Sequence, residues 1–547
     1  MGYLASKTNP KSQGFREKAH LNWMGGASYF MNSPIATLRM AAASCFFGEP
    51  QYYHRDNKDT RSLRHSPSSR LTDSNVKVLQ ETLDCIMPES WRGMSPSEMM
   101  EKAIDAALDH DVEATLEVAV NLRHEDYIRT TPQVILVRAA MHPKAKGTGL
   151  IRKYATRIIT RADEPAVGLS YFGYLAGGKG NIRKIPNSLK KAYADALARF
   201  DSYQLAKYRL EGHKISTVDV VRLVHPERTE AIDALYKGNL KVTDKTWEGI
   251  ISSKGSSKET WEESLEVMGH MALLRNLRNL IEKGVSPSLF VDKLVDGVLY
   301  GKQLPFRYYS AYNSIKHLAS PKVLDAVEKC LEISFENSPK FSGRVMSLCD
   351  NSGSATGTTT SSLGTMRVCD IANLTGVITG KMADEGYVGI FGDHLETFPV
   401  RGKSSIFDLV DKSSKIGSNI GGSTENGIWL FWDNAIKQEE HWDHVFVYSD
   451  MQAGHGGLYG TDGSKYRDYI WGGKGGGGIP FIDVPKLIST YRQKVNPNVN
   501  VYLVQVAGYR DTIAPEFYNR TYILGGWGPG ILKFAAKASG ICDEKSQ

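Results

Sequence analysis

The chain has 547 residues, of which 41% are hydrophobic and 23% charged, and its formal net charge is +7. This length is too great for one hydrophobic core and predicts about two to four folding units. The ordinary composition excludes wholesale disorder, and the modest net charge bears on partners only where it is concentrated.

The N-terminal residues and the cysteines indicate the cellular location of the protein. The first residues are polar, and the most apolar stretch, residues 35–47, is interrupted by Arg39 and too short to span a bilayer. The six cysteines are scattered without CxxC pairs, as is typical of reduced proteins. We therefore expect a cytoplasmic protein without a membrane partner.

Helical patterns dominate the first part of the chain. Residues 1–20 are polar and rich in Gly, Asn, Pro and Lys, which predicts a loosely held, flexible arm. Beyond them, Ser33–Pro34 and Thr131–Pro132 are helix-start signals, residues 187–200 place their apolar side chains on one face, and Lys283–Gly284 is a helix stop. Amphipathic helices joined by short breaks predict an irregular α-solenoid, although no strict repeat period is present.

Cations greatly outnumber carboxylates between residues 144 and 214. The cations of this basic block are Lys144, Lys146, Arg152, Lys153, Arg157, Arg161, Lys179, Arg183, Lys184, Lys190, Lys191, Arg199, Lys207, Arg209 and Lys214. On a curved helical surface such a block is a track for nucleic acid, whereas on separate helices it is only their solvated faces. Charge alone favours neither interpretation.

A buried-strand pattern opens the second part of the chain, after a hinge at residues 335–344. The run Val345–Cys349 lacks polar alternation and leads directly into Asp350, Ser352 and Ser354. Ligands bind at the carboxyl ends of parallel strands, and one carboxylate with two hydroxyls suits Mg²⁺, Mn²⁺ or Ca²⁺ rather than zinc. A Ser/Asp-rich turn without a metal is the alternative.

Two later stretches add ligands of the same kind. A polar loop at residues 421–424 offers Ser423 or Thr424, of which we favour Thr424, and a strand-like run ends at Asp450. The expected Mg²⁺ ligands are Asp350, Ser352, Ser354, Thr424 and Asp450. The expected further strands are residues 387–391, 445–448, 499–504 and 521–524. With helices between them they predict a doubly wound α/β sheet, and the glycine-rich residues 454–478 predict a long loop at its metal face.

Particular motifs resemble known families. Asp-x-Ser-x-Ser, a Thr loop and a strand-terminal Asp, in this order, resemble the metal-ion-dependent adhesion site of von Willebrand factor A domains. The motifs that resemble the TROVE module of Ro ribonucleoprotein autoantigens are RTTPQV at 129–134, PNSLKK at 186–191 with KYR at 207–209, VVRLVHP at 220–226, ALLRNL at 272–277 and LPFRY at 304–308. The resemblance covers residues 30–540.

The resemblance implies an α part joined to an α/β part. Residues 21–336 would form a HEAT-like helical-repeat ring, the TROVE domain, closed by a doubly wound von Willebrand A-like domain at 341–540 and preceded by the arm at 1–20. It implies an RNA-binding scaffold, a monomeric ring that binds small structured noncoding RNAs such as Y RNA and single-stranded 3′ ends of misfolded RNA. Bacterial relatives cooperate with a 3′-to-5′ exoribonuclease, so such an enzyme is an expected partner.

Within the matching motifs, cationic side chains are the candidates for contacts to RNA phosphates. They are Lys190, Lys191, Lys207, Arg209 and Arg222, and for each of them decoration of a helix surface is the alternative. We expect Arg129 and Arg275 to be buried structural arginines paired with carboxylates, and His225 to be a capping or core histidine rather than a base reader. For Phe306 and Tyr308 we expect packing between helices, and stacking on RNA bases is the alternative.

Two other classes of function compete with the RNA scaffold. One is a protein-interaction module of the adhesion type, whose metal captures an acidic side chain of a partner while the helices are structural. The other is a metal-dependent hydrolase, which is poorly equipped because only two carboxylates and His455 could supply acid–base chemistry. We therefore expect no enzyme.

Overall fold

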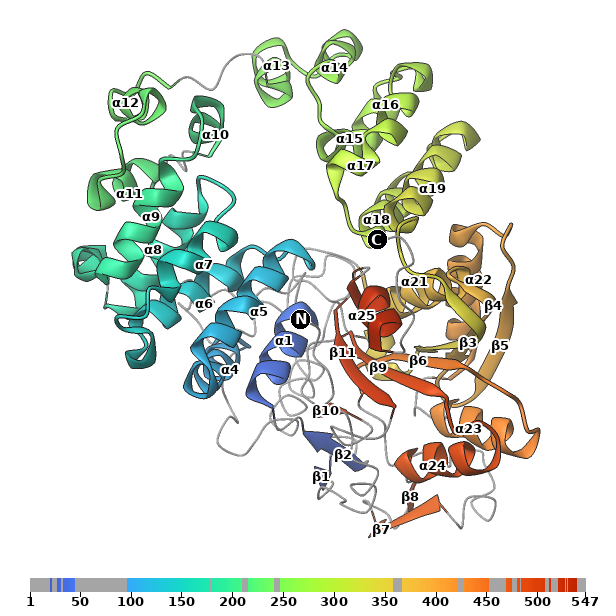
Figure 1. The fold of residues 1–547 in the computed structure, drawn as a ribbon. Coiled ribbons are helices and arrows are strands. Elements are labelled where there is room, and N and C mark those ends of the chain that lie inside the picture. Colours follow the sequence, from blue (N-terminus) through green and yellow to red (C-terminus); the bar gives the residue numbers. More distant parts are fainter. Residues whose placement is uncertain are drawn as a thin grey trace, which may run out of the picture. The chain divides into compact units, whose positions relative to one another are not determined.

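The structure is a computed structural model (Figure 1). It describes residues 20–21, 27–30, 33–44, 96–177, 179–208, 215–240, 246–357, 366–421, 427–451, 469–474, 480–482, 484–506, 511–512, 520–526, 528 and 530–538. These belong to two compact units, one from Met100 to Glu336 and one that holds the chain from Asn337 onward together with N-terminal segments. The arm predicted at residues 1–20 lies outside the described residues except for His20.

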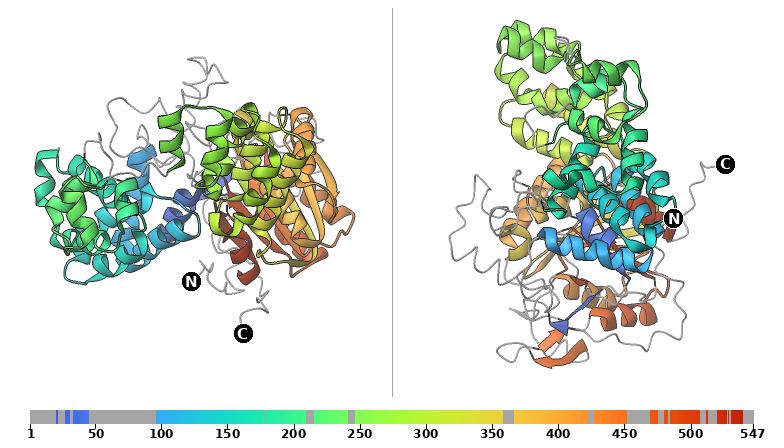
Figure 2. Two further views of the ribbon diagram at one scale, coloured as in Figure 1. Left: turned by 90° about the horizontal axis from the view of Figure 1, so that it is seen from above. Right: turned by 90° about the vertical axis from the view of Figure 1, so that its left-hand side faces the viewer.

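The helical unit follows the predicted pattern of successive helices. They are α4 (Pro96–His110), α5 (Val112–His124), α6 (Thr130–Met141), α7 (Leu150–Ile158), α8 (Glu164–Leu175), α9 (Asn187–Leu197), α10 (Ser202–Lys207), α11 (Thr217–Val224), α12 (Glu230–Tyr236), α13 (Trp247–Lys254), α14 (Lys258–Leu265), α15 (His270–Glu282), α16 (Val291–Asp296), α17 (Val298–Gly301), α18 (Pro305–Ile315) and α19 (Pro321–Phe335). Figure 2 shows them, in blue, green and yellow, stacked on their neighbours in sequence.

Local sequence signals fix where several of these helices begin and end. At α10, Asp201 accepts the N–H of Gln204 at 2.7 Å and Gln204 accepts the N–H of Asp201 at 3.2 Å, which satisfies two otherwise unpaired N–H groups. The predicted stop of α15 is confirmed, because the helix ends at Glu282 and Gly284 has the left-handed φ of +71° that glycine adopts without strain.

Close packing between helices depends on a few positions. A Cβ added at Gly168 of α8 would lie 2.0 Å from the hydroxyl oxygen of Tyr193 on α9, so only glycine permits this approach. On the other side of the unit, Nε2 of His270 on α15 lies 2.8 Å from the hydroxyl oxygen of Tyr308 on α18. Phe306 and Tyr308 are 1% and 0% exposed, which confirms that they pack between helices.

The second unit is an α/β unit around a six-stranded sheet. Its strands are β3 (Phe341–Asp350), β4 (Ala383–Phe391), β5 (Leu395–Val400), β6 (His444–Ser449), β9 (Asn500–Gln505) and β11 (Thr521–Gly525). The order across the sheet is β11-β9-β6-β3-β4-β5, and all neighbours are parallel except β4 and β5. All four further strands expected from the sequence are present, as β4, β6, β9 and β11.

Helices cover both faces of this sheet. They are α20 (Gly353–Gly357), α21 (Val368–Lys381), α22 (Ile406–Asn419), α23 (Gly427–Lys437), α24 (Val484–Lys494) and α25 (Gly530–Ala538). Met346 and Leu348 of β3 point into an apolar cluster with α23 and α24, whereas Cys349 lies against Gly376 of α21 on the other face. The central strands are therefore buried on both sides, as their unbroken apolar runs predict.

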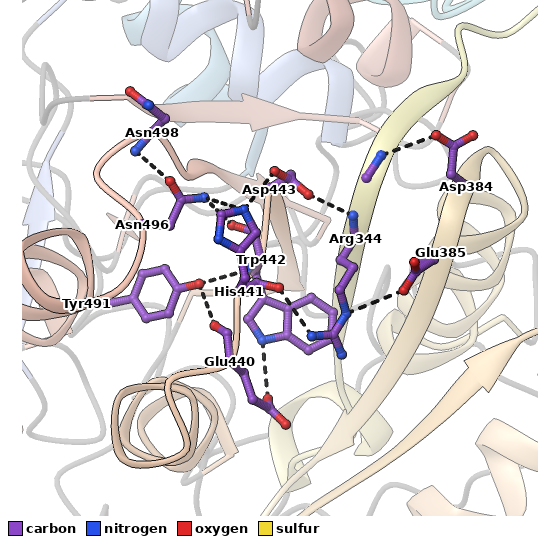
Figure 3. Close-up of polar contacts among 11 residues, drawn as sticks. Arg344, Asp384, Glu385, Glu440, His441, Trp442, Asp443, Tyr491, Asn496 and Asn498 are labelled. Atoms are coloured by element: carbon purple, nitrogen blue, oxygen red, sulfur yellow. Dashed lines mark hydrogen bonds and ion pairs between the residues drawn. The ribbon is translucent and has the colours of Figure 1, made fainter.

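A polar cluster ties the amino ends of the strands together (Figure 3). Asp443, before β6, accepts the backbone N–H of Arg344 at 2.8 Å and lies 3.1 Å from Nε2 of His441. The guanidinium of Arg344 stacks 4.3 Å from the ring centre of Trp442, and Asn496 donates to the carbonyl of Trp442 at 2.7 Å. These contacts hold β3, β6 and the start of β9 in register at one end, which fixes which residues meet at the other.

Three smaller elements belong to the N-terminal segments and the edge of the second unit. They are β1 (His20–Leu21), β2 (Ala27–Phe30) and β10 (Asp511–Thr512), which form a small antiparallel sheet. Helix α1 (Pro34–Ser44) packs on β11, where the carbonyl oxygen of Met40 lies 2.7 Å from a Cβ built on Gly525. Residues 21–336 were expected to form the helical domain, but α1 belongs to the α/β unit.

A two-stranded sheet, β7 (Ile470–Lys474) and β8 (Pro480–Ile482), falls in and after the glycine-rich stretch at 454–478. The rest of that predicted loop lies outside the described residues. Among the helices that the structure describes, none is long and apolar enough to cross a membrane.

Candidate metal centre and nucleic-acid interface

Four of the five predicted metal ligands, Asp350, Ser352, Ser354 and Asp450, follow the carboxyl ends of two strands of the sheet. Asp350 is the last residue of β3, and Asp450 directly follows β6, the neighbouring parallel strand. The pairing of Cys349 with Tyr448 places Asp350 level with the residue before Asp450. Both residues are buried, at 0% and 1% exposure, so their carboxylates lie in the protein interior rather than on an open loop.

Hydrogen bonds hold the Asp350 carboxylate in place. Its Oδ1 accepts the backbone N–H of Ser352 at 2.9 Å, and its Oδ2 accepts the hydroxyl of Ser449 at 2.5 Å. The hydroxyl oxygens of Ser352 and Ser354 lie 3.1 Å apart. The turn therefore fixes the Asp350 carboxylate and brings the hydroxyls of Ser352 and Ser354 together.

Several side chains that support this site were missed by sequence reasoning. Ser449 bonds Asp350, Gln505 at the end of β9 donates to the carbonyl of Asp450 at 2.8 Å, and Asn351 exchanges amide hydrogen bonds with Asn373 at 2.8 and 3.1 Å. The sequence feature that could have identified Ser449 and Gln505 is a polar residue at the end of each apolar strand run. Its role depends on which strands are neighbours, and strand order is not written in the sequence.

The start of the predicted threonine loop is held by the turn after β4. The N–H of Asp393 is 3.4 Å from the carbonyl oxygen of Gly421, and a Cβ on Gly392 would lie 2.0 Å from that same oxygen. Gly421 itself has a φ of +84°. Thr424 and Ser423 lie outside the described residues, so the choice between them stays a prediction.

The donor chemistry fits a hard divalent cation. Asp350, Ser352, Ser354 and Asp450 supply oxygen atoms alone, which is the set that Mg²⁺ prefers. Within the described part of the chain, no three His, Cys, Asp or Glu side chains come together as a metal cluster. The residues would thus hold Mg²⁺ through two carboxylates and hydroxyl groups, and they do not suit zinc.

Part of the basic block is engaged in ion pairs between helices. On α7, Arg152 bonds Asp195 of α9 at 2.9 Å, and Arg157 bonds Glu117 of α5 at 2.8 Å. The hydrogen bond from Arg157 is the main cause that lowers the pKa of Glu117. These cations join neighbouring helices, which neither the nucleic-acid track nor the solvated-face interpretation of the block predicts.

The predicted RNA-contacting residues differ from these cations because they lack ion pairs within the described residues. Lys191 of α9 and Arg222 of α11 are exposed and Lys190 is partly buried, and none of the three makes an ion pair within the described residues. Helices α9 and α11 pack on each other, so these cations share one region of the helical unit. Arg209 lies outside the described residues.

Lys207 belongs to a cluster of cations and aromatic rings that sequence reasoning missed. Its Nζ lies 3.4 Å from the hydroxyl oxygen of Tyr203, and 5.6 and 5.8 Å from the ring centres of Tyr203 and Tyr208. Arg161 covers the Tyr208 ring at 4.3 Å. Tyr203 is 55% exposed, so an aromatic face beside positive charge is open to solvent.

Two predictions about single residues have opposite outcomes. His225 caps α11: it has a φ of 52°, and its N–H donates to the carbonyl of Val221 at 3.1 Å, which confirms the capping role. The expectation of carboxylate partners for Arg129 and Arg275 is wrong within the described residues, where both side chains are exposed and neither forms an ion pair.

Comparison with known protein families matches the TROVE domain at residues 95–243 and 237–331, which together span the helical unit. Comparison with solved structures finds the Deinococcus radiodurans Ro (RSR) protein, with a TM-score of 0.53 and 16% identity over 80% of this chain and 93% of that one. Hence residues 95–331 match a TROVE domain, and 80% of the chain has a fold similar to that of this Ro protein.

Two curated relatives match smaller parts of this chain. Telomerase protein component 1 of Rattus norvegicus is 22% identical over 356 residues, 47% of this chain, and that of Mus musculus is 22% identical over 295 residues, 38% of this chain. The chain spans only 14% and 11% of the lengths of these two relatives. Residues 95–331 therefore form a TROVE domain, and the fold is similar to that of a Ro protein.

Proposed function

We propose that the protein is a noncatalytic RNA-binding scaffold that binds small structured noncoding RNA, of the Y RNA type, and single-stranded 3′ ends of misfolded RNA. The observation that carries this proposal is the set of cations on α9, α10 and α11 that lack carboxylate partners among the described residues. They lie within a TROVE domain, the module of RNA-binding Ro proteins.

The chemistry of this surface suits RNA in two ways. Lys190, Lys191 and Arg222 carry long flexible stems whose charges are available to backbone phosphates. Tyr203 and Tyr208, flanked by Lys207, offer ring faces on which unpaired bases stack, at about 1–3 kcal/mol per base. Phosphate contacts and stacking together favour RNA with unpaired nucleotides over a blunt duplex.

The metal site supports a second candidate function. A Mg²⁺ ion bound by Asp350, Ser352, Ser354, Thr424 and Asp450 would supply an open coordination position for an acidic side chain. Ser449 and the Ser352 N–H fix the orientation of the Asp350 carboxylate for this role. In this alternative the protein is an adhesion-type interaction module and its helices are structural.

Further parts of the proposal follow from the family resemblance alone. They are a monomeric ring closed by the α/β unit, a 3′-to-5′ exoribonuclease as partner, and a cytoplasmic location. Copurification from native cells, followed by sequencing of bound RNA and identification of bound protein, tests them together.

Binding of matched RNAs tests the main proposal. We expect a hairpin with a single-stranded 3′ tail to bind better than a blunt duplex of equal length, with an affinity that falls steeply as salt rises. Lys190→Glu with Lys191→Glu should weaken this binding. Lys322→Glu with Lys329→Glu, the same charge change at exposed positions of α19, is the matched control. Equal affinities for the two double variants would contradict the proposal.

A further inference from the structure

Large hydrophobic side chains are exposed on two neighbouring segments of the helical unit. Val267 lies between α14 and α15, Met271 lies in the first turn of α15, and Leu299 and Tyr300 lie in α17. Their exposed fractions range from 44% for Val267 to 88% for Tyr300. Single exposed hydrophobic side chains are ordinary, whereas a contiguous group of them marks a surface that a partner covers.

Contacts of His270 bring the two segments together, as the positions of α15 and α17 in Figure 1 show. A Cβ built on Gly297 would lie 2.9 Å from Cβ of His270, and one built on Gly301 would lie 2.2 Å from its Cδ2. The exposed residues of α17 stand between these two glycines, and His270 directly precedes Met271. The exposed side chains therefore form one surface, the apolar patch, which consists of Val267, Met271, Leu299 and Tyr300.

Hydrogen bonds fix the backbone that carries the apolar patch. Nζ of Lys293 on α16 donates to the carbonyl of Glu266 at 3.2 Å and also to the carbonyl of Leu265. Nε2 of His270 lies 2.8 Å from the hydroxyl oxygen of Tyr308. The apolar patch is thus held in place before a partner binds, which lowers the entropy that binding costs.

Acidic side chains flank the apolar patch. Glu266 directly precedes it, and Asp292 and Asp296 lie one turn apart on α16, the helix that leads into α17. All three are exposed and form no ion pair within the described residues, while Lys293 beside them bonds backbone carbonyls. Lys302, at the end of α17, offsets one of these charges. The surface around the apolar patch is therefore negative, so it repels phosphate groups and attracts a cationic partner.

We propose that the apolar patch docks a basic segment of a partner protein. Apolar side chains of that segment cover Leu299 and Tyr300, and its lysines or arginines meet Glu266, Asp292 and Asp296. Tyrosine and methionine are enriched in protein interfaces, and charges at the rim select a partner of opposite sign. This surface differs in charge from the cations of α9, α10 and α11, so it serves a protein rather than RNA.

Binding of a defined peptide to the full chain tests the hydrophobic part of this proposal. The probe is a synthetic peptide of leucine and lysine at helical spacing, which we expect to bind at least about tenfold better than its counterpart with glutamate in place of lysine. Leu299→Ser with Tyr300→Ser should weaken binding of the lysine peptide about tenfold. Both side chains are mostly exposed, so the fold should be unaffected. Met141→Ser with Leu318→Ser, which removes two exposed hydrophobic side chains elsewhere on the helical unit, should bind like wild type.

Neutralising the acids tests the electrostatic part and leaves the hydrophobic side chains in place. Asp292→Asn with Asp296→Asn should weaken binding of the lysine peptide and make it less sensitive to salt. Asp325→Asn with Glu332→Gln, at exposed positions of α19, is the matched control and should bind like wild type. Equal binding of the two peptides, or equal binding by either variant and its control, overturns the docking site.

Two further measurements distinguish other occupants of the apolar patch. A hairpin RNA with a single-stranded 3′ tail should bind Leu299→Ser with Tyr300→Ser as it binds wild type, and a loss of RNA binding would make the patch a nucleic-acid surface. Sedimentation equilibrium should give the same mass for wild type and this variant. A dimer that wild type forms and the variant does not would assign the patch to a second copy of the chain. Either result overturns the proposal of a basic protein partner.

Discussion

Ser449 at the end of β6 donates its hydroxyl hydrogen to Oδ2 of Asp350 at the end of β3, across 2.5 Å and with both residues fully buried. The bond links two parallel strands at the carboxyl end of the sheet, where the predicted metal ligands Asp350 and Asp450 lie. Each carboxylate oxygen of Asp350 accepts one hydrogen bond, so the carboxylate has a fixed orientation without a bound cation.

Replacing Ser449 by alanine should destabilise the protein without removing a metal ligand. A buried carboxylate oxygen that loses its donor costs about 1–3 kcal/mol. We expect the free energy of unfolding in urea to fall by this amount in the absence of Mg²⁺, while added Mg²⁺ still raises the melting temperature. A Ser449→Ala protein as stable as wild type would show that the hydrogen bond contributes nothing.

Asp350→Ala should abolish the rise in melting temperature that Mg²⁺ produces, because a cation that binds only the folded state stabilises it by mass action. Asp350→Asn keeps the size of the side chain and should also lose the effect. Asp384→Ala, at the opposite end of the sheet, serves as control and should respond like wild type. If the folded Asp350→Ala protein also lost RNA binding, the metal face would have to contact RNA.

Gly392→Ala should weaken Mg²⁺ binding through the threonine loop. The added Cβ would lie 2.0 Å from the carbonyl oxygen of Gly421, so the backbone at the start of that loop must shift. We expect a higher Mg²⁺ concentration for half-maximal stabilisation. A Cβ on Gly402 meets nothing within 4 Å, so Gly402→Ala is the matched control, and the same Mg²⁺ response in both variants would contradict the role of Thr424.

Tyr193 and Gly168 should show strong coupling in a double-mutant cycle. Gly168→Ala places a Cβ 2.0 Å from the Tyr193 hydroxyl and should cost about 1–3 kcal/mol by overpacking. Tyr193→Phe removes a buried hydroxyl that has no hydrogen-bond partner within the described residues, so it should be neutral or stabilising. The double variant should recover most of the lost free energy in urea unfolding. Additive effects would mean that the two helices relax apart.

His444 should make stability depend on pH below neutrality. Burial against Phe341 and Tyr502 lowers its pKa to about 4, against about 6.5 in the unfolded chain. The folded state binds fewer protons, so this contribution is complete above pH 6.5 and is lost as pH falls from there toward 4. Its full size is about 3 kcal/mol. His444→Leu should flatten the change in unfolding free energy between pH 6.5 and 4.5, and an unchanged slope would contradict the assignment.

The positions of the proposed metal ligands at strand ends could be predicted from the sequence better than the partners of the cations in the helical unit. Asp350 and Asp450 were found because each ends an apolar run, and buried parallel strands deliver such residues to a common edge. Ser449 and Gln505 were missed because their partners lie on neighbouring strands, and the order of strands is set by packing between distant segments. The docking of α1 on β11 was missed for the same reason.

The basic block was harder to interpret because charge on a helix does not reveal its partner. Arg157 and Lys191 have the same character in the sequence, yet Glu117, forty residues earlier, engages only the first. The separation of structural from available cations needs the packing of α5, α7 and α9. Exposed Tyr203 beside Lys207 is likewise visible only once α10 is folded.

The buried cysteines among the described residues can report transient unfolding of each unit. Cys330 of α19 and Cys349 and Cys369 beside the metal face are 0–1% exposed, and burial raises the pKa of all three thiols, to about 12 for Cys330 and Cys369. A thiol reagent can reach them only when the surrounding structure opens, because the thiolate is the reactive form. The labelling rate of Cys330 therefore measures transient unfolding of the TROVE helices, and that of Cys349 measures transient unfolding of the sheet. A ligand that slows the labelling of one of these cysteines and leaves the other unchanged therefore binds to, and stabilises, the unit that holds the protected cysteine.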